Sequence, residues 1–131
     1  MQIKYRRSMG TKGMLSSTVY VLDALLLPSP EEAELLQRFG RTGERIWTYA
    51  DEEIRDVTDE HYKQLSGLTF QQLISGHRFQ YKNFNDVLRS ERIIKDACQS
   101  VLATCETLAT FNDSERVLEV TSEGHEFLAE G

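Results

Sequence analysis

Apolar and polar residues alternate along the start of the chain at the spacing of a β-strand. In residues 2–7, Ile3 and Tyr5 point to one side and the polar residues between them to the other, which predicts a half-exposed edge strand. Residues 16–27 are rich in β-branched and aromatic side chains and predict a second, longer strand. Because a glycine-containing turn region, 10–13, separates the two segments, we expect an antiparallel hairpin.

A short helix is predicted from the signals at its two ends. Ser29 is a suitable N-cap, Pro30 fits the first helical position, and Glu32 completes a capping box. Gly40 supplies the left-handed position that commonly closes a helix. The sequence therefore predicts a helix over 30–39.

The middle and the end of the chain carry shorter patterns. Aromatic and β-branched residues favour a strand near Trp47, the acidic run after it has no clear periodicity, and Thr69 is a suitable N-cap. The elements that these patterns predict are a third strand at 45–50, a loop over most of 51–66, a short helix that begins after Thr69 and ends at Gly76, a fourth strand at 77–82 and a fifth at 116–120.

A long amphipathic helix at 84–111 is the strongest pattern in the chain. Leu88 and Ile93 lie at opposite margins of its apolar stripe, so the stripe is wider than the roughly 100° that a single packing contact requires. Either the helix 30–39 and the C-terminal strand cover both flanks, or a partner helix does so across a symmetric dimer. The centre of the stripe is formed by Val87, Ile94, Cys98, Val101, Cys105 and Leu108.

These elements predict an α+β fold of two layers. We expect a mostly antiparallel sheet of about four to five strands, with one long amphipathic helix (84–111) and a shorter helix (30–39). The length of 131 residues suits a single domain, which we place at residues 1–122, followed by a flexible acidic tail at 123–131.

Composition narrows the class of protein. Apolar residues make up 40% of the chain and charged residues 27%, as in soluble globular proteins. No apolar run approaches the roughly 18 residues of a membrane span, and no apolar stretch like that of a secretory signal follows the basic N-terminus. We therefore expect a cytoplasmic protein that makes no contact with a membrane.

The two cysteines, Cys98 and Cys105, lie seven residues apart in the predicted long helix. Two helical turns separate them by roughly 10 Å, which is too far for a disulfide or for shared zinc ligation. We expect both to be buried apolar side chains.

Residues that carry enzymatic chemistry are scattered. His61 follows two acids but lacks the spacing of a metal site, His77 opens a predicted strand, and His125 lies in the predicted tail. The sequence contains no GxSxG, Walker A or GxGxxG motif. We therefore predict no catalytic residue, no metal ligand and no cofactor.

Two other features leave alternatives open. The range 40–43 is a glycine-containing loop that could bind an anion, or simply a helix stop followed by a turn. Glu91 lies near the apolar stripe, where burial would raise the pKa of a carboxylate, although an acid is also favoured there by the helix dipole.

Charge is distributed unevenly around a net value of −6. Residues 1–22 hold cations and no acid, whereas residues 51–60 hold six acids against Arg55. The overall charge opposes nonspecific binding of nucleic acid. An acidic partner protein, or the acidic region of another subunit, would suit the basic end. The predicted interaction surface consists of Lys4, Arg6, Arg7, Leu88 and Ile93.

The function that these features favour is a small noncatalytic protein-interaction module, with a homodimer as one form of it. A small enzyme or ligand-binding domain is the first alternative, and it requires that at least two of Glu91, His61, His77 and Arg45 converge on a pocket. Weak nucleic-acid binding through the basic N-terminal strand is the second. The alternation of side chains along the strand argues against this alternative, because it places Tyr5 on the opposite side of the strand from Lys4 and Arg6.

Overall fold

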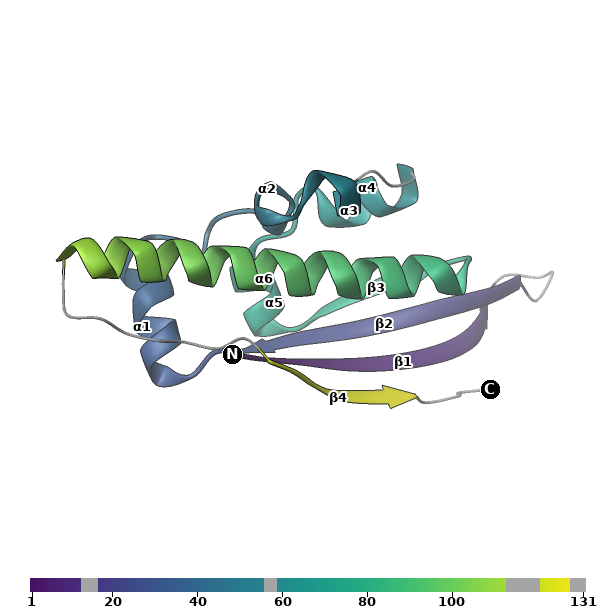
Figure 1. The fold of residues 1–131 in the computed structure, drawn as a ribbon. Helices are drawn as coiled ribbons and strands as arrows, with labels where there is room; N and C mark the ends of the chain where they lie inside the picture. Colours follow the sequence, from purple (N-terminus) through teal and green to yellow (C-terminus); the bar gives the residue numbers. More distant parts are fainter. Residues whose placement is uncertain (13–16, 56–58, 113–120, 128–131) are drawn as a thin grey trace.

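The computed structural model describes residues 1–12, 17–55, 59–112 and 121–127, and it has an α+β fold with one long helix (Figure 1). Its elements in chain order are β1 (Gln2–Lys12), β2 (Ser17–Leu27), α1 (Pro30–Arg38), α2 (Ile46–Tyr49), α3 (Glu52–Arg55), α4 (Asp59–Leu65), α5 (Phe70–Ser75), β3 (His77–Tyr81), α6 (Phe84–Asn112) and β4 (Thr121–Phe127).

The strands lie in the order β3-β2-β1-β4. Strands β3, β2 and β1 form an antiparallel sheet, so the antiparallel part has three strands and not the predicted four to five. β4 pairs with β1 in parallel. The predicted strand 116–120 lies outside the described residues, and residues 121–127 form β4 where we expected a flexible tail from residue 123.

The predicted hairpin of β1 and β2 is confirmed. Its register pairs Tyr5 with Ala24 and continues without interruption to Lys12, which pairs with Ser17. β1 therefore extends beyond the predicted 2–7, because cross-strand pairing carries the backbone past the point where the alternation ends. The odd-numbered side chains 1–7 are buried and the even-numbered ones 2–6 are exposed, as period two requires.

The capping signals are confirmed at both short helices that they predicted. At α1 the Ser29 hydroxyl accepts from the Glu32 N–H at 3.2 Å, and the Glu32 carboxylate accepts from the Ser29 N–H at 2.9 Å. Thr69 and Gln72 form the same arrangement at α5. Gly40 follows α1 with φ +66°, a conformation that glycine adopts without strain.

The predicted strand at 45–50 is wrong, because residues 46–49 form helix α2. Only Arg45 pairs as in a sheet, through an isolated bridge to Thr69. Ile46, the first residue of α2, is fully buried, and α2 packs against α6. The packing of this segment against α6 has overridden the β propensity of its residues.

The predicted loop over most of 51–66 is also wrong, because it contains α3 and α4. The Asp51 side chain accepts from the Glu53 N–H at 2.9 Å, as an N-cap does. Leu65 is fully buried at the end of α4. Acidic residues obscured the short helical pattern in this segment.

Helix α6 lies between the sheet and a second group of helices (Figure 1). The sheet contacts it on one side, and α2, α3 and α4 contact it on the other, while α1 packs near its C-terminal end. Helix α1 packs on α6, as one of the two predicted arrangements required, and helices α2–α4, which were not predicted, pack on it as well. The C-terminal strand of that arrangement, 116–120, lies outside the described residues. This group of helices is an addition to the two layers that we expected.

We predict that Ser29→Ala lowers the free energy of unfolding by about 1 kcal/mol, because it removes the hydroxyl that caps α1. Urea unfolding followed by circular dichroism measures this change. Ser75→Ala is the matched control, since Ser75 is exposed at the end of α5, and it should change stability by less than about 0.5 kcal/mol. Equal effects of the two substitutions would contradict the capping role.

Candidate interaction surface

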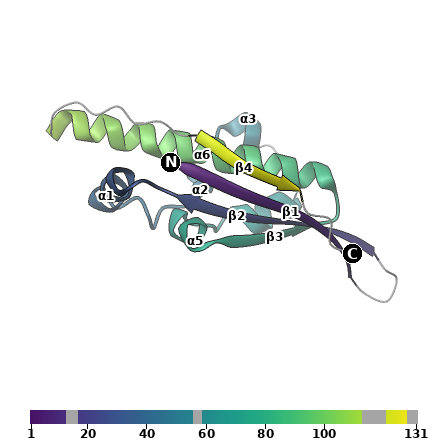
Figure 2. The same ribbon diagram turned by 90° about the horizontal axis from the view of Figure 1, so that it is seen from below.

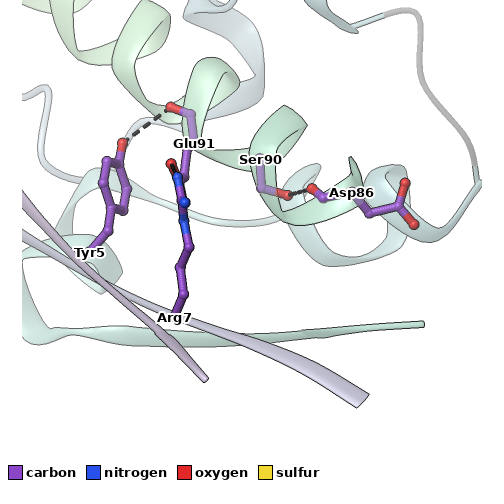
Figure 3. Close-up of polar contacts among 5 residues, drawn as sticks. All are labelled: Tyr5, Arg7, Asp86, Ser90 and Glu91. Atoms are coloured by element: carbon purple, nitrogen blue, oxygen red, sulfur yellow. Dashed lines mark hydrogen bonds and ion pairs between the residues drawn. The ribbon is translucent and has the colours of Figure 1, made fainter. Parts of the chain in front are cut away.

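Arg7 lies on the buried side of β1 and not with the exposed cations of the same strand. Its side chain reaches α6, where Nε and Nη2 donate to the two carboxylate oxygens of Glu91, each at 2.5 Å (Figure 3). Only 8% of Arg7 and 6% of Glu91 is exposed. The two residues, which the sequence analysis considered separately, form a bidentate ion pair inside the molecule.

Neighbouring groups complete this buried pair. The Tyr5 hydroxyl donates to the backbone oxygen of Glu91 at 3.1 Å, and burial raises the pKa of that phenol well above its ordinary value. The guanidinium carbon of Arg7 lies 5.7 Å from the centre of the Phe84 ring, in cation–π range. One of the two hypotheses for Glu91 placed it in the interior, and the structure shows it buried there. The Arg7 guanidinium balances its charge.

A second polar contact joins α6 to the sheet one residue earlier. The Ser90 hydroxyl bonds to the Tyr81 hydroxyl at 2.5 Å and to the backbone oxygen of Asp86 at 2.9 Å, and the latter contact is drawn in Figure 3. Both Ser90 and Tyr81 are buried. Two consecutive residues of α6 are therefore bonded to two different strands, β1 and β3.

Lys4 and Arg6 lie on the opposite side of the sheet, which we call the open face. Figure 2 shows the strands in front of α6 when the molecule is seen from this side. Both cations are exposed. By the register of the hairpin and of β3, the side chains of this face are Gln2, Lys4, Arg6 and Ser8 of β1, Val19, Val21, Asp23, Leu25 and Leu27 of β2, and Arg78 and Gln80 of β3.

The middle of the open face contains an ion pair. Arg78 donates from Nε and Nη2 to the two carboxylate oxygens of Asp23, at 2.8 and 3.0 Å. Arg6 lies directly across from Asp23 in the hairpin register. Among the described side chains of this face, three cations thus accompany one carboxylate.

The aliphatic part of the open face was missed by sequence reasoning. Val21, Leu25 and Leu27 are half-buried on this face. Because most residues of β2 are apolar, the alternation between its two sides is hard to read from the sequence. Asp23 could have revealed it, because an acid in an apolar strand marks the side that faces water and residues two positions away share that side.

Leu88 and Ile93, the two predicted interaction residues of the long helix, differ in their surroundings. Ile93 is fully buried. Three residues later, the Asp96 carboxylate accepts from the Asp51 N–H at 2.5 Å, so the segment before α3 covers this flank. Leu88 is half-buried on the other flank. The structure therefore separates Ile93 from the open face and leaves Leu88 partly accessible.

The loop 40–43 is bonded to neighbouring residues of the same chain. The Arg41 guanidinium donates to the Glu44 carboxylate at 3.2 Å and to the Tyr49 hydroxyl at 3.1 Å. The Thr42 oxygen accepts from the Gln71 N–H at 2.8 Å. These contacts fit the interpretation of a helix stop and a turn.

The residues proposed for an enzymatic site lie on different elements. Glu91 lies on α6 and is paired with Arg7 of β1. His77 begins β3, and Arg45 is the exposed N-cap of α2. The His77 ring centre is 4.8 Å from that of Phe79, and burial lowers the pKa of this histidine from its ordinary value. The side chains of His61 and His125 lie outside the described part of the structure.

Cys98 and Cys105 are both fully buried free thiols, as the sequence predicted. Burial raises the pKa of Cys98 to about 12 and also raises that of Cys105. Both thiols therefore stay protonated at neutral pH, and a protonated thiol is a poor nucleophile.

The described residues contain no group of three or more His, Cys, Asp or Glu side chains placed to hold a metal ion. Within the same residues, no helix is both long and apolar enough to cross a membrane. No protein-family model, curated protein or solved structure matches the chain.

We predict that a thiol reagent such as DTNB leaves native protein unlabelled at pH 8 and labels two thiols per chain after denaturation, because burial blocks access and keeps both thiols protonated. Absorbance of the released chromophore measures the reaction. As the pH rises from about 9 toward 12, Cys98 ionises in the unfolded chain before it does so in the native one, so native stability falls. Rapid labelling of native protein at pH 8 would contradict the buried position of the cysteines.

Proposed function

We propose that the chain is a noncatalytic protein-binding module and that its partner binds to the open face. The observation that carries this proposal is a sheet face on which half-buried aliphatic side chains lie beside exposed cations, with the long helix packed on the other face. Protein-binding sites combine apolar side chains with polar and charged ones, and on this face the Asp23–Arg78 ion pair lies among the aliphatic side chains.

The chemistry of the open face favours an acidic partner segment that also has apolar side chains. Leu25 lies across from Lys4 in the hairpin register, so an apolar contact and a cation are presented side by side. A segment that alternates aliphatic and acidic residues would satisfy both. Complementary charge would mainly speed association and select the partner.

Nucleic acid is a weaker match to the same surface. Single-stranded nucleic acid is bound by stacking on aromatic rings, and Tyr5, the aromatic residue nearest to the two cations, is buried beneath the sheet. The open face also holds the Asp23 carboxylate, which would repel phosphate. The net charge of −6 acts in the same direction.

We predict that Lys4→Glu/Arg6→Glu weakens partner binding at least about tenfold, equivalent to 1.4 kcal/mol. Tagged wild-type and variant chains would be used to isolate partners from the native host, and the partner found would then be purified and titrated. Arg92→Glu/Lys95→Glu is the matched control, because it reverses two exposed charges on α6 and changes the net charge equally.

The outcome decides between the classes of partner. An acidic protein that is retained by wild type and control, lost by Lys4→Glu/Arg6→Glu and released by salt supports the proposal. A protein that all three chains retain equally would place the binding site elsewhere. Retention of DNA or RNA at low salt, reduced by the open-face variant, would replace the proposal with nucleic-acid binding.

A further inference from the structure

The hairpin is longer than the elements that pack beside it. Among the described residues, β1 and β2 pair regularly out to Lys12 and Ser17, whereas β3 pairs with residues 20–24 and β4 with residues 2–7. Within this part of the chain the outer hairpin is therefore a two-stranded ribbon, and Figure 1 shows it extending past the beginning of α6. A two-stranded ribbon is at best marginally stable alone, so regular pairing out to its end favours a covering partner.

Apolar side chains gather where this ribbon meets α6. Met9 and Tyr20 are opposite each other in the hairpin register, and the Phe84 ring centre lies 5.8 Å from that of Tyr20. Leu88 follows Phe84 by one helical turn and shares its side of α6. We call these four residues the distal apolar patch. Met9 is 45% exposed and Phe84 38%, which are high values for large apolar side chains.

We propose that a second copy of this chain covers the distal apolar patch and forms a symmetric dimer. A two-fold axis brings the same surface of both copies together, so a patch that carries charge of one sign would repel itself. None of the four residues is charged, and the nearby Arg7 guanidinium is neutralised by Glu91. Among the described side chains of the open face, cations outnumber carboxylates, which disfavours contact of this face with its own copy.

The ribbon supplies further surface of the same character. Thr11 and Thr18 are cross-strand partners one position beyond the patch on the same side of the hairpin, and both are exposed. A stable dimer commonly buries about 800 Å² per partner, which four side chains alone do not provide. Uncharged hydroxyls beside the apolar patch extend the surface without adding repulsion.

Light scattering after gel filtration tests this proposal. At micromolar concentration we expect wild type to have a mass near twice 15.1 kDa. Met9→Glu places two like charges across the two-fold axis and should raise the dissociation constant at least tenfold, and Phe84→Ser should act in the same direction. Phe111→Ser is the matched control, since Phe111 is 83% exposed at the other end of α6, and it should leave the mass unchanged.

Three results would overturn the proposal. Wild type could have the mass of one chain, Met9→Glu could remain dimeric, or the open-face variant Lys4→Glu/Arg6→Glu could be the one that dissociates. Circular dichroism checks each variant for folding. Met9 is exposed, so its substitution decides the question even if Phe84→Ser loses the Arg7 contact and unfolds.

Discussion

A buried bidentate ion pair between Arg7 of β1 and Glu91 of α6 determines where the long helix lies on the sheet. Burying either charge alone is costly, so each residue must remain against the other, and the contact joins positions 84 residues apart. With the Tyr5 and Ser90 bonds on either side, it fixes both the position and the rotation of α6. The remaining helices then pack on a helix whose orientation is already set.

Both proposed surfaces follow from this constraint. Because Arg7 points inward, strand alternation leaves Lys4 and Arg6 on the open face. Phe84 lies about two helical turns before Glu91, so anchoring Glu91 on β1 brings the start of α6 against Tyr20. The charged surface and the neutral one are thus on different parts of the molecule, which would let a partner and a second copy bind at the same time.

Local patterns predicted the elements whose signals are contained within a few residues. The hairpin, the capping boxes at Ser29 and Thr69 and the stripe of α6 depend on alternation, capping and helical periodicity. Helix α2 was missed because its aromatic residues favour a strand and only packing against α6 selects a helix. The Arg7–Glu91 pair was missed for a related reason, since each residue is visible in the sequence but their contact depends on the complete fold. Of the predicted interaction residues, the structure places Lys4 and Arg6 together and takes Arg7 and Ile93 into the interior.

A double-mutant cycle between positions 7 and 91 tests most directly whether the buried pair anchors the helix. Arg7→Met and Glu91→Leu should each lower the free energy of unfolding by about 3–5 kcal/mol, because each leaves one buried charge without its partner. The double substitution should be far less destabilising than the sum of the two, with a coupling energy of at least about 2 kcal/mol. A cycle that pairs Lys4→Met with Glu91→Leu should be additive, since Lys4 lies on the opposite face. Additive effects at positions 7 and 91, within about 0.5 kcal/mol, would contradict the account.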